Sequence, residues 1–131
     1  MKIPIAKAVS QIGTPGLIVD GLIGYRLKGA PHGAVADLIR WANAQPAPIL
    51  ALDIPSGIDT TSGIVFDPAI QATATMTLAL PKAGLRAPGV EAYVGELYLA
   101  DISVPPSLYA EPTLALEVGP LFAESEILPL R

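Results

Sequence analysis

Two apolar runs that each end in a carboxylate constrain the fold of this chain more than any other feature. The first spans residues 17–19 and is followed by Asp20, and the second spans residues 49–52 and is followed by Asp53. Neither run alternates polar with apolar residues, which is typical of strands covered on both faces in a parallel sheet. Asp53 follows Asp20 by 33 positions, which suits one strand–helix–strand unit of roughly 30 or more residues. We therefore predict two adjacent parallel strands, with both carboxylates at the same edge of the sheet.

The segment between the two runs predicts a helix over residues 33–45. Its apolar residues repeat at the i, i+3, i+4, i+7 spacing of one helix face; they are Val35, Leu38, Ile39 and Ala42. Pro46 and Pro48 end the pattern. Trp41 flanks the apolar face, and we expect it to pack there rather than to bind a ligand.

Beyond residue 54 the sequence predicts strands but no second convincing helix. We expect these strands at residues 72–80, 93–102 and 114–118, with part of the pairing antiparallel. Near the start of the chain, residues 6–11 suit a short helix, and the tail over residues 119–131 has no strong pattern. Three tyrosines are expected to pack on the sheet: Tyr93, Tyr98 and Tyr109.

Composition excludes several classes of protein. The 131 residues suit one domain, or part of one, and we expect a single partial domain over residues 1–131. Eight Lys and Arg against 12 Asp and Glu give a net charge of −4, which argues against nucleic acid as the main partner. The absence of cysteine excludes a disulfide scaffold, a thiolate metal site and a cysteine nucleophile. Because the apolar runs are broken every few residues, we expect no membrane span but a cytoplasmic protein, some of whose apolar surface faces a partner.

The loops after the two carboxylates are the expected functional region, because ligands of open α/β sheets bind outside the carboxyl ends of the strands. The first loop, residues 24–30, is rich in glycine and carries Arg26 and Lys28, which can meet an anion. It matches neither the Walker A nor the GxGxxG pattern. Taken alone, it also fits a flexible crossover loop with solvated cations.

The second loop reads DIPSGID over residues 53–59. A carboxylate that closes a buried strand is costly unless it is paired, hydrogen-bonded or bound to a cation. A local turn capped by Asp53 or Ser56 satisfies this requirement, but two such carboxylates at one edge favour a functional site. They suit either an acid/base pair or, with the Ser56 hydroxyl and nearby carbonyls, an all-oxygen cation site.

The remaining polar residues carry weaker signals. His32 is the only imidazole, which argues against transition-metal chemistry, and we expect it in a surface loop. A triad of Ser56 and His32 with a carboxylate lacks the sequence of a nucleophile elbow. Lys82 and Arg86 are expected to face solvent, although they are placed where they can reach a substrate.

Over roughly residues 17–106 the chain resembles the NAD(P)H-hydrate epimerases, also called the YjeF amino-terminal domain. The resemblance rests on motifs that occur in the order of the family; they are LIVDGLIG at 17–24, LDIPSG at 52–57, LPKAGL at 80–85 and YVGELYLADISVP at 93–105. It implies a Rossmann-like three-layer αβα sandwich with a mostly parallel sheet. It also implies an isomerase that interconverts the R and S epimers of hydrated NADH and NADPH, with a bound potassium ion.

The resemblance also implies roles for particular residues. Asp20 and Ser56 would hold the potassium ion. Asp53 would contact the hydrated nicotinamide and act as the acid/base group. The first loop would contact the dinucleotide through Gly24, Tyr25, Arg26, Leu27, Lys28, Gly29 and Ala30.

The sequence departs from the family in one respect, because it contains no Asn-Asn-Gly-Gly-Asp-Gly loop. We therefore expect the C-terminal part of the domain, completed by a complementing N-terminal half or associated as a homo-oligomer. One alternative is a non-catalytic module of the same fold that binds a dinucleotide or RNA, or dimerises, as related domains do in eukaryotic decapping scaffolds. A second alternative is an unrelated nucleotide-binding hydrolase or phosphotransferase, which no phosphate-binding motif supports.

Overall fold

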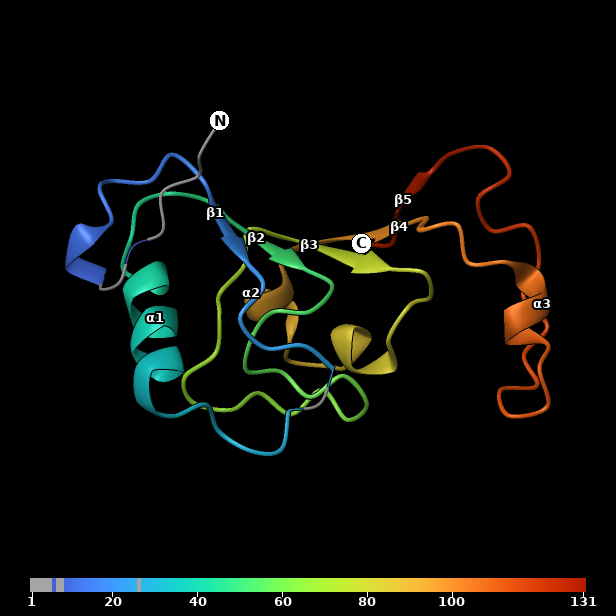
Figure 1. The fold of residues 1–131 in the computed structure, drawn as a ribbon, viewed down its shortest axis with the longest axis horizontal. Coiled ribbons are helices and arrows are strands. Elements are labelled where there is room, and N and C mark those ends of the chain that lie inside the picture. Colours follow the sequence, from blue (N-terminus) through green and yellow to red (C-terminus); the bar gives the residue numbers. More distant parts are fainter. Residues whose placement is uncertain (1–5, 7–8, 26) are drawn as a thin grey trace.

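The computed structural model describes residues 6, 9–25 and 27–131 and contains one five-stranded sheet in the order β1-β2-β3-β4-β5 (Figure 1). The first four strands are parallel, and β5 is antiparallel to β4. The strands are β1 (Ile18–Asp20), β2 (Ile49–Leu52), β3 (Ala74–Leu78), β4 (Glu96–Ala100) and β5 (Ile127–Pro129). Asp20 is in register with Ala51, two residues before Asp53. The predicted placement of both carboxylates at one edge of adjacent parallel strands is therefore confirmed.

The helix predicted between the first two strands is also confirmed, as α1 (Gly33–Asn43). The other helices are short; they are α2 (Glu91–Val94), α3 (Pro106–Tyr109) and the 3₁₀ turns η1 (Val9–Gln11) and η2 (Ala83–Arg86). Of the helix expected at residues 6–11, the described part forms only η1. No described helix has the length and the apolar character that crossing a membrane requires.

In the C-terminal half, one predicted strand is wrong and another is shorter than predicted. Residues 114–118 form no strand, because Leu114 and Ala115 donate backbone hydrogen bonds to Glu111 within a local turn. The fifth strand lies instead in the tail, where Leu128 pairs with Leu99 of β4. The strand expected at residues 93–102 is interrupted, because α2 occupies its start and β4 begins only after Gly95.

Gly95 separates α2 from β4 in a backbone conformation that only glycine adopts easily, with φ +62° and ψ −143°. A Cβ at this position would lie 2.2 Å from the carbonyl oxygen of Thr73. We predict that Gly95→Ala lowers the free energy of unfolding by about 2–4 kcal/mol, measured by urea denaturation. Gly89→Ala is the control, because Gly89 has φ +90° but no neighbour within 4 Å of an added Cβ. Equal losses in the two variants would show that the contact with Thr73 is unimportant.

The core lies on one face of the sheet, beneath α1, α2 and η2 (Figure 1). One buried cluster joins α1 to β2, and Trp41 packs against it as predicted. A second cluster joins α2 and η2 to β4. Cross-strand neighbours confirm that both clusters share a face, because Ala51 pairs with Thr75 and Thr75 pairs with Leu97.

The opposite face of the sheet has no helix of the described chain over it, so the described residues do not form the third layer that the resemblance implies. We call this surface the open face and define it by five apolar side chains that are half-buried or exposed: Val19, Leu50, Leu52, Met76 and Tyr98. Val19 is 59% exposed and Leu52 is 49% exposed. Parallel sheets are normally covered on both faces, so this surface is suited to a further layer.

Candidate functional site

Asp20 and Ser56 join the loops that follow β1 and β2. Asp20 is 2% exposed and Ser56 1%. The Asp20 carboxylate accepts hydrogen bonds from the Ser56 backbone N–H (2.7 Å), the Ser56 hydroxyl (2.7 Å) and the Leu22 backbone N–H (3.2 Å). The Ser56 hydroxyl in turn accepts a hydrogen bond from the Ile23 backbone N–H at 2.9 Å. These bonds compensate the desolvation of a buried carboxylate and hold the two loops together.

Asp53 ends β2 with a left-handed backbone, φ 67°. Its Oδ1 atom accepts three hydrogen bonds, from the Thr77 hydroxyl (3.2 Å), the Leu78 backbone N–H (3.0 Å) and the Lys82 ammonium (2.5 Å). Its Oδ2 atom has no hydrogen-bond partner among the described residues. The side chain is 29% exposed. Asp53 therefore has one fixed carboxylate oxygen and one oxygen available to a ligand.

The prediction that Lys82 faces solvent is wrong. Its side chain is only 18% exposed, pairs with Asp53 and also donates to the Leu78 carbonyl at 3.0 Å. The cause is a tight turn after β3, where Ala79 has φ 64° and the chain folds back over the strand end. The position of Lys82 soon after a strand indicated the same edge of the sheet as Asp53, but the contact itself depends on the turn at Ala79, which the sequence does not mark. Arg86 is exposed, as predicted.

Only part of the loop over residues 24–30 lines a pocket. Leu27, Lys28, Gly29 and Ala30 line a shallow pocket of about 320 Å³. Gly24 and Tyr25 are exposed and do not line it, and Arg26 lies outside the described residues. His32 is exposed, as predicted, and lines the same pocket before the start of α1.

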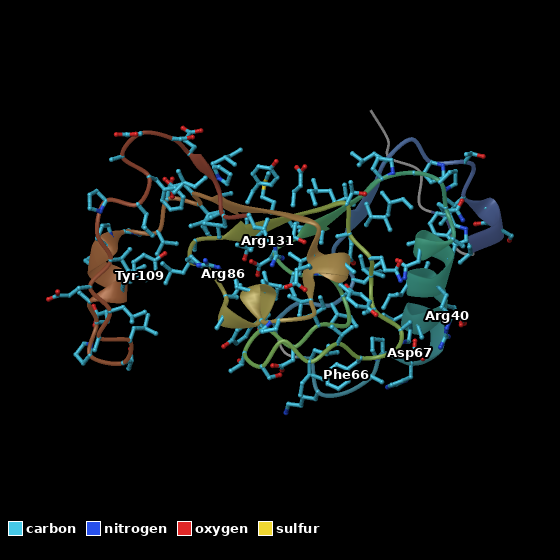
Figure 2. All side chains as sticks on the ribbon, turned by 180° about the vertical axis from the view of Figure 1, so that it is seen from behind. Arg40, Phe66, Asp67, Arg86, Tyr109 and Arg131 are labelled. Carbon is cyan, nitrogen blue, oxygen red and sulfur yellow. The ribbon has the colours of Figure 1, made fainter. Side chains whose placement is uncertain are left out.

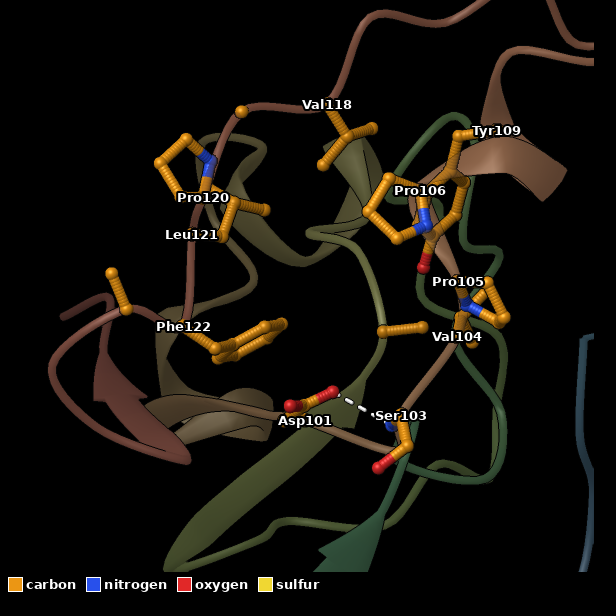
Figure 3. A pocket seen from close by; sticks show the side chains of 13 residues that line it. Asp101, Ser103, Val104, Pro105, Pro106, Tyr109, Val118, Pro120, Leu121 and Phe122 are labelled. Carbon is orange, nitrogen blue, oxygen red and sulfur yellow. Dashed lines mark hydrogen bonds between the residues drawn. The ribbon is translucent and has the colours of Figure 1, made fainter.

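Two other hollows contain none of the predicted site residues. One, of about 450 Å³, lies between residues 101–106 and 118–123 and has mostly apolar walls (Figure 3). Tyr109 lines it from α3 instead of packing on the sheet, so that prediction is wrong. The other, of about 510 Å³, lies between the end of α1 and residues 65–71, where Figure 2 labels Arg40, Phe66 and Asp67.

Among the described residues, the pKa values of Asp59 and Tyr98 are displaced, and neither side chain is hydrogen-bonded to Asp20 or Asp53. Hydrogen bonds from the Ser62 backbone and hydroxyl lower the pKa of Asp59. The hydrogen bond from the Tyr98 hydroxyl to the Glu96 carboxylate raises the pKa of Tyr98. Among the described residues, no group of three or more His, Cys, Asp or Glu side chains is placed to bind a metal ion. The carboxyl edge therefore offers oxygen ligands and one ion pair, but no dense metal-binding cluster.

This mostly parallel sheet, with polar side chains gathered at its carboxyl edge, is a Rossmann-like α/β fold. The crystal structure of the yeast protein ynu0 has the same fold, with a TM-score of 0.67 and 20% sequence identity. That match covers 88% of this chain and 46% of the yeast chain.

The sequence comparisons define the family. The family model "YjeF-related protein N-terminus" matches residues 1–84, and the chain belongs to this family. A protein of Dehalogenimonas lykanthroporepellens named NAD(P)H-hydrate epimerase is 41% identical over 113 residues, which are 86% of this chain and 44% of that protein. The NAD(P)H-hydrate epimerase of Limosilactobacillus fermentum is 36% identical over 76% of this chain and 48% of its own length. The chain thus spans less than half the length of these relatives.

Proposed function

We propose that this chain carries the acid/base half of an NAD(P)H-hydrate epimerase, an isomerase that interconverts the R and S forms of hydrated NADH and NADPH. The observation that carries the proposal is Asp53, whose Oδ1 atom is fixed by three donors while Oδ2 has no partner among the described residues. It lies at the edge of the sheet where open α/β proteins bind ligands. The relatives named NAD(P)H-hydrate epimerase support this choice of substrate.

The chemistry of the substrate explains why a single carboxyl group suffices. Hydration of an enamine places a hydroxyl on the ring carbon beside the ring nitrogen. Protonation of that hydroxyl lets it leave as water, while the nitrogen lone pair forms a carbon–nitrogen double bond. Water then adds to the other face and loses a proton. Asp53 supplies the first proton on its own side of the ring, and its carboxylate takes back the second through a water molecule from the other face, so the proton balance closes.

The loop over residues 24–30 is proposed to bind the diphosphate of the dinucleotide. Lys28 lines the shallow pocket there, and a cation favours a phosphate ligand. Gly29 has φ 112°, which lets the backbone approach a ligand closely. The part assigned to Arg26 stays a prediction.

A potassium ion is proposed to bind beside Asp20 and Ser56. Carboxylate and hydroxyl oxygens are suitable ligands for a hard cation. A carboxylate has roughly four acceptor sites, of which the three hydrogen bonds to Asp20 occupy three. The two residues therefore fit such an ion only as partial ligands, with backbone, water or substrate oxygens completing the shell. When bound, the ion would supply fixed positive charge near the substrate.

The test is to incubate one purified epimer of hydrated NADH with the folded chain and to follow the other epimer by chromatography. Interconversion above the rate without protein supports the proposal. Binding of the hydrate without interconversion would instead favour the non-catalytic binding module. An absence of both binding and interconversion would contradict both functions for this chain.

The open face is proposed to bind a second copy of the chain or a complementing N-terminal half. β1 is an edge strand of the sheet that the described residues form, so it offers a strand edge for pairing beside the same surface. We predict self-association that depends on concentration in sedimentation velocity, weakened at least about tenfold by Leu52→Lys, because a buried unpaired charge is costly. Leu108→Lys is the matched control, since Leu108 is 51% exposed but lies on α3. Equal behaviour of the two variants would show that the open face does not mediate the association.

A further inference from the structure

Lys82 lies at the carboxyl edge but has no role in the reaction outlined above. Its ammonium group contacts two acceptors, Oδ1 of Asp53 and the carbonyl oxygen of Leu78. The second contact ties the ammonium to the end of β3, four residues earlier in the chain. Lys82 is thus held at the end of β3, next to Asp53 at the end of the neighbouring strand β2.

Stability alone is a weak reason for this arrangement. Fixing a long lysine side chain loses rotamer freedom, and partly exposed ion pairs gain little free energy in return. The backbone conformations that bring the pair together are also uncommon, because Asp53 and Ala79 both have a positive φ. Such strained residues concentrate at functional sites.

The three donors all act on the same oxygen of Asp53. Thr77 and the Leu78 backbone N–H approach from β3, and Lys82 approaches from the turn that follows it. A carboxylate held in this way cannot rotate freely, so its second oxygen keeps one orientation. That is what a group needs when it must give and take a proton at a fixed carbon centre.

We infer that Lys82 is a positioning residue: its ammonium fixes Oδ1 of Asp53 and leaves Oδ2 to exchange protons with the substrate. The inference rests on the proposed function, because the proton exchange belongs to the epimerisation. It goes beyond that function by assigning a task to a residue that touches Asp53 rather than the substrate.

The kinetic test compares Lys82→Met, which keeps an unbranched side chain of similar length and removes the charge, with the unchanged chain. We expect the turnover number to fall by about 100-fold, because a misplaced reacting group costs about that much, while the KM changes by less than about threefold. Lys82→Arg restores part of the turnover because it restores the cation. Arg86→Met is the control, since Arg86 is an exposed cation four residues further on, and it should behave like the unchanged chain.

Three outcomes would overturn the inference. One is a turnover number for Lys82→Met within twofold of the unchanged chain. Another is a higher KM at unchanged turnover, which would make Lys82 a substrate-binding group. The third is a loss of turnover that follows a lower unfolding midpoint and is not restored by Lys82→Arg, which would make its role structural.

A labelling measurement separates failure of this inference from failure of the proposed function, because it needs no turnover. Acetic anhydride acetylates lysine side chains, and mass spectrometry compares the acetylation rates of different lysines in one sample. We expect Lys82 to react at least about fivefold more slowly than the exposed Lys28, and Asp53→Asn to remove most of that difference. Equal rates in the unchanged chain would overturn the inference even if the epimerisation were observed. Slow labelling released by Asp53→Asn, in a chain that does not turn over, would confirm the pair and place the failure in the proposed function.

Discussion

Replacing Asp53 by asparagine is expected to lower the rate of epimerisation by about 10²–10⁴-fold, the usual contribution of a general acid or base. Asparagine keeps the shape of the side chain and can still accept hydrogen bonds from Thr77 and Leu78, but it cannot exchange a proton with the substrate. We therefore expect the loss in the turnover number, with the affinity for hydrated NADH nearly unchanged. Progress curves at several substrate concentrations separate these two quantities.

Asp101→Asn is the control for this prediction. Asp101 follows β4 at the same edge of the sheet, is exposed, and accepts a hydrogen bond from the Ser103 backbone N–H at 2.7 Å. Its replacement removes one negative charge from the same edge but leaves Asp53 intact. A similar loss in both variants would mean that general electrostatics, not proton transfer by Asp53, explains the effect.

Replacing Asp20 by alanine is expected to have the largest effect on stability, about 3–5 kcal/mol in the free energy of unfolding. The substitution leaves the Ser56 backbone N–H and hydroxyl without their shared acceptor in a buried environment. A buried unsatisfied donor costs about 1–3 kcal/mol, and hydrogen bonds to charged groups lie at the upper end of the range. Urea denaturation measures the change.

Asp37→Ala provides the comparison on the surface. Asp37 lies on α1 and pairs with Arg40 at 3.6 Å, with both side chains largely exposed. Such a pair contributes about 0–1 kcal/mol. If Asp20→Ala destabilises the chain no more than Asp37→Ala does, then the bridge between the two loops does not hold the site together.

The sequence predicted the part of the fold that depends on local pattern. Residues 49–52 form β2 as expected, and α1 buries Ile39 and Ala42 of its predicted apolar face together with Ala36. The shared edge of Asp20 and Asp53 also followed from the spacing, since a parallel connection fixes the direction of both strands. The link between Asp20 and Ser56 joins residues 36 positions apart, so it is not the local turn that the second loop alone suggested, and the cation site stays a prediction.

The features that the sequence did not predict depend on contacts between distant residues. β5 is set by its pairing with β4, and its own three residues have no alternating pattern. Lys82 reaches Asp53 only because Ala79 turns the chain back at the end of β3. Alanine is an unusual residue for a positive φ, so no turn signal marked that position.

The most direct test of the central claim is to locate bound hydrated NADH on the chain by two-dimensional ¹H–¹⁵N NMR. The site described here predicts that the largest shifts on titration fall in the backbone amides of residues 20–30, 53–57 and 77–82. Residues 101–123, which contain most of the walls of the apolar pocket in Figure 3, should change little. Shifts concentrated in that pocket, with the amides of Asp53 and Ser56 unaffected, would contradict the account.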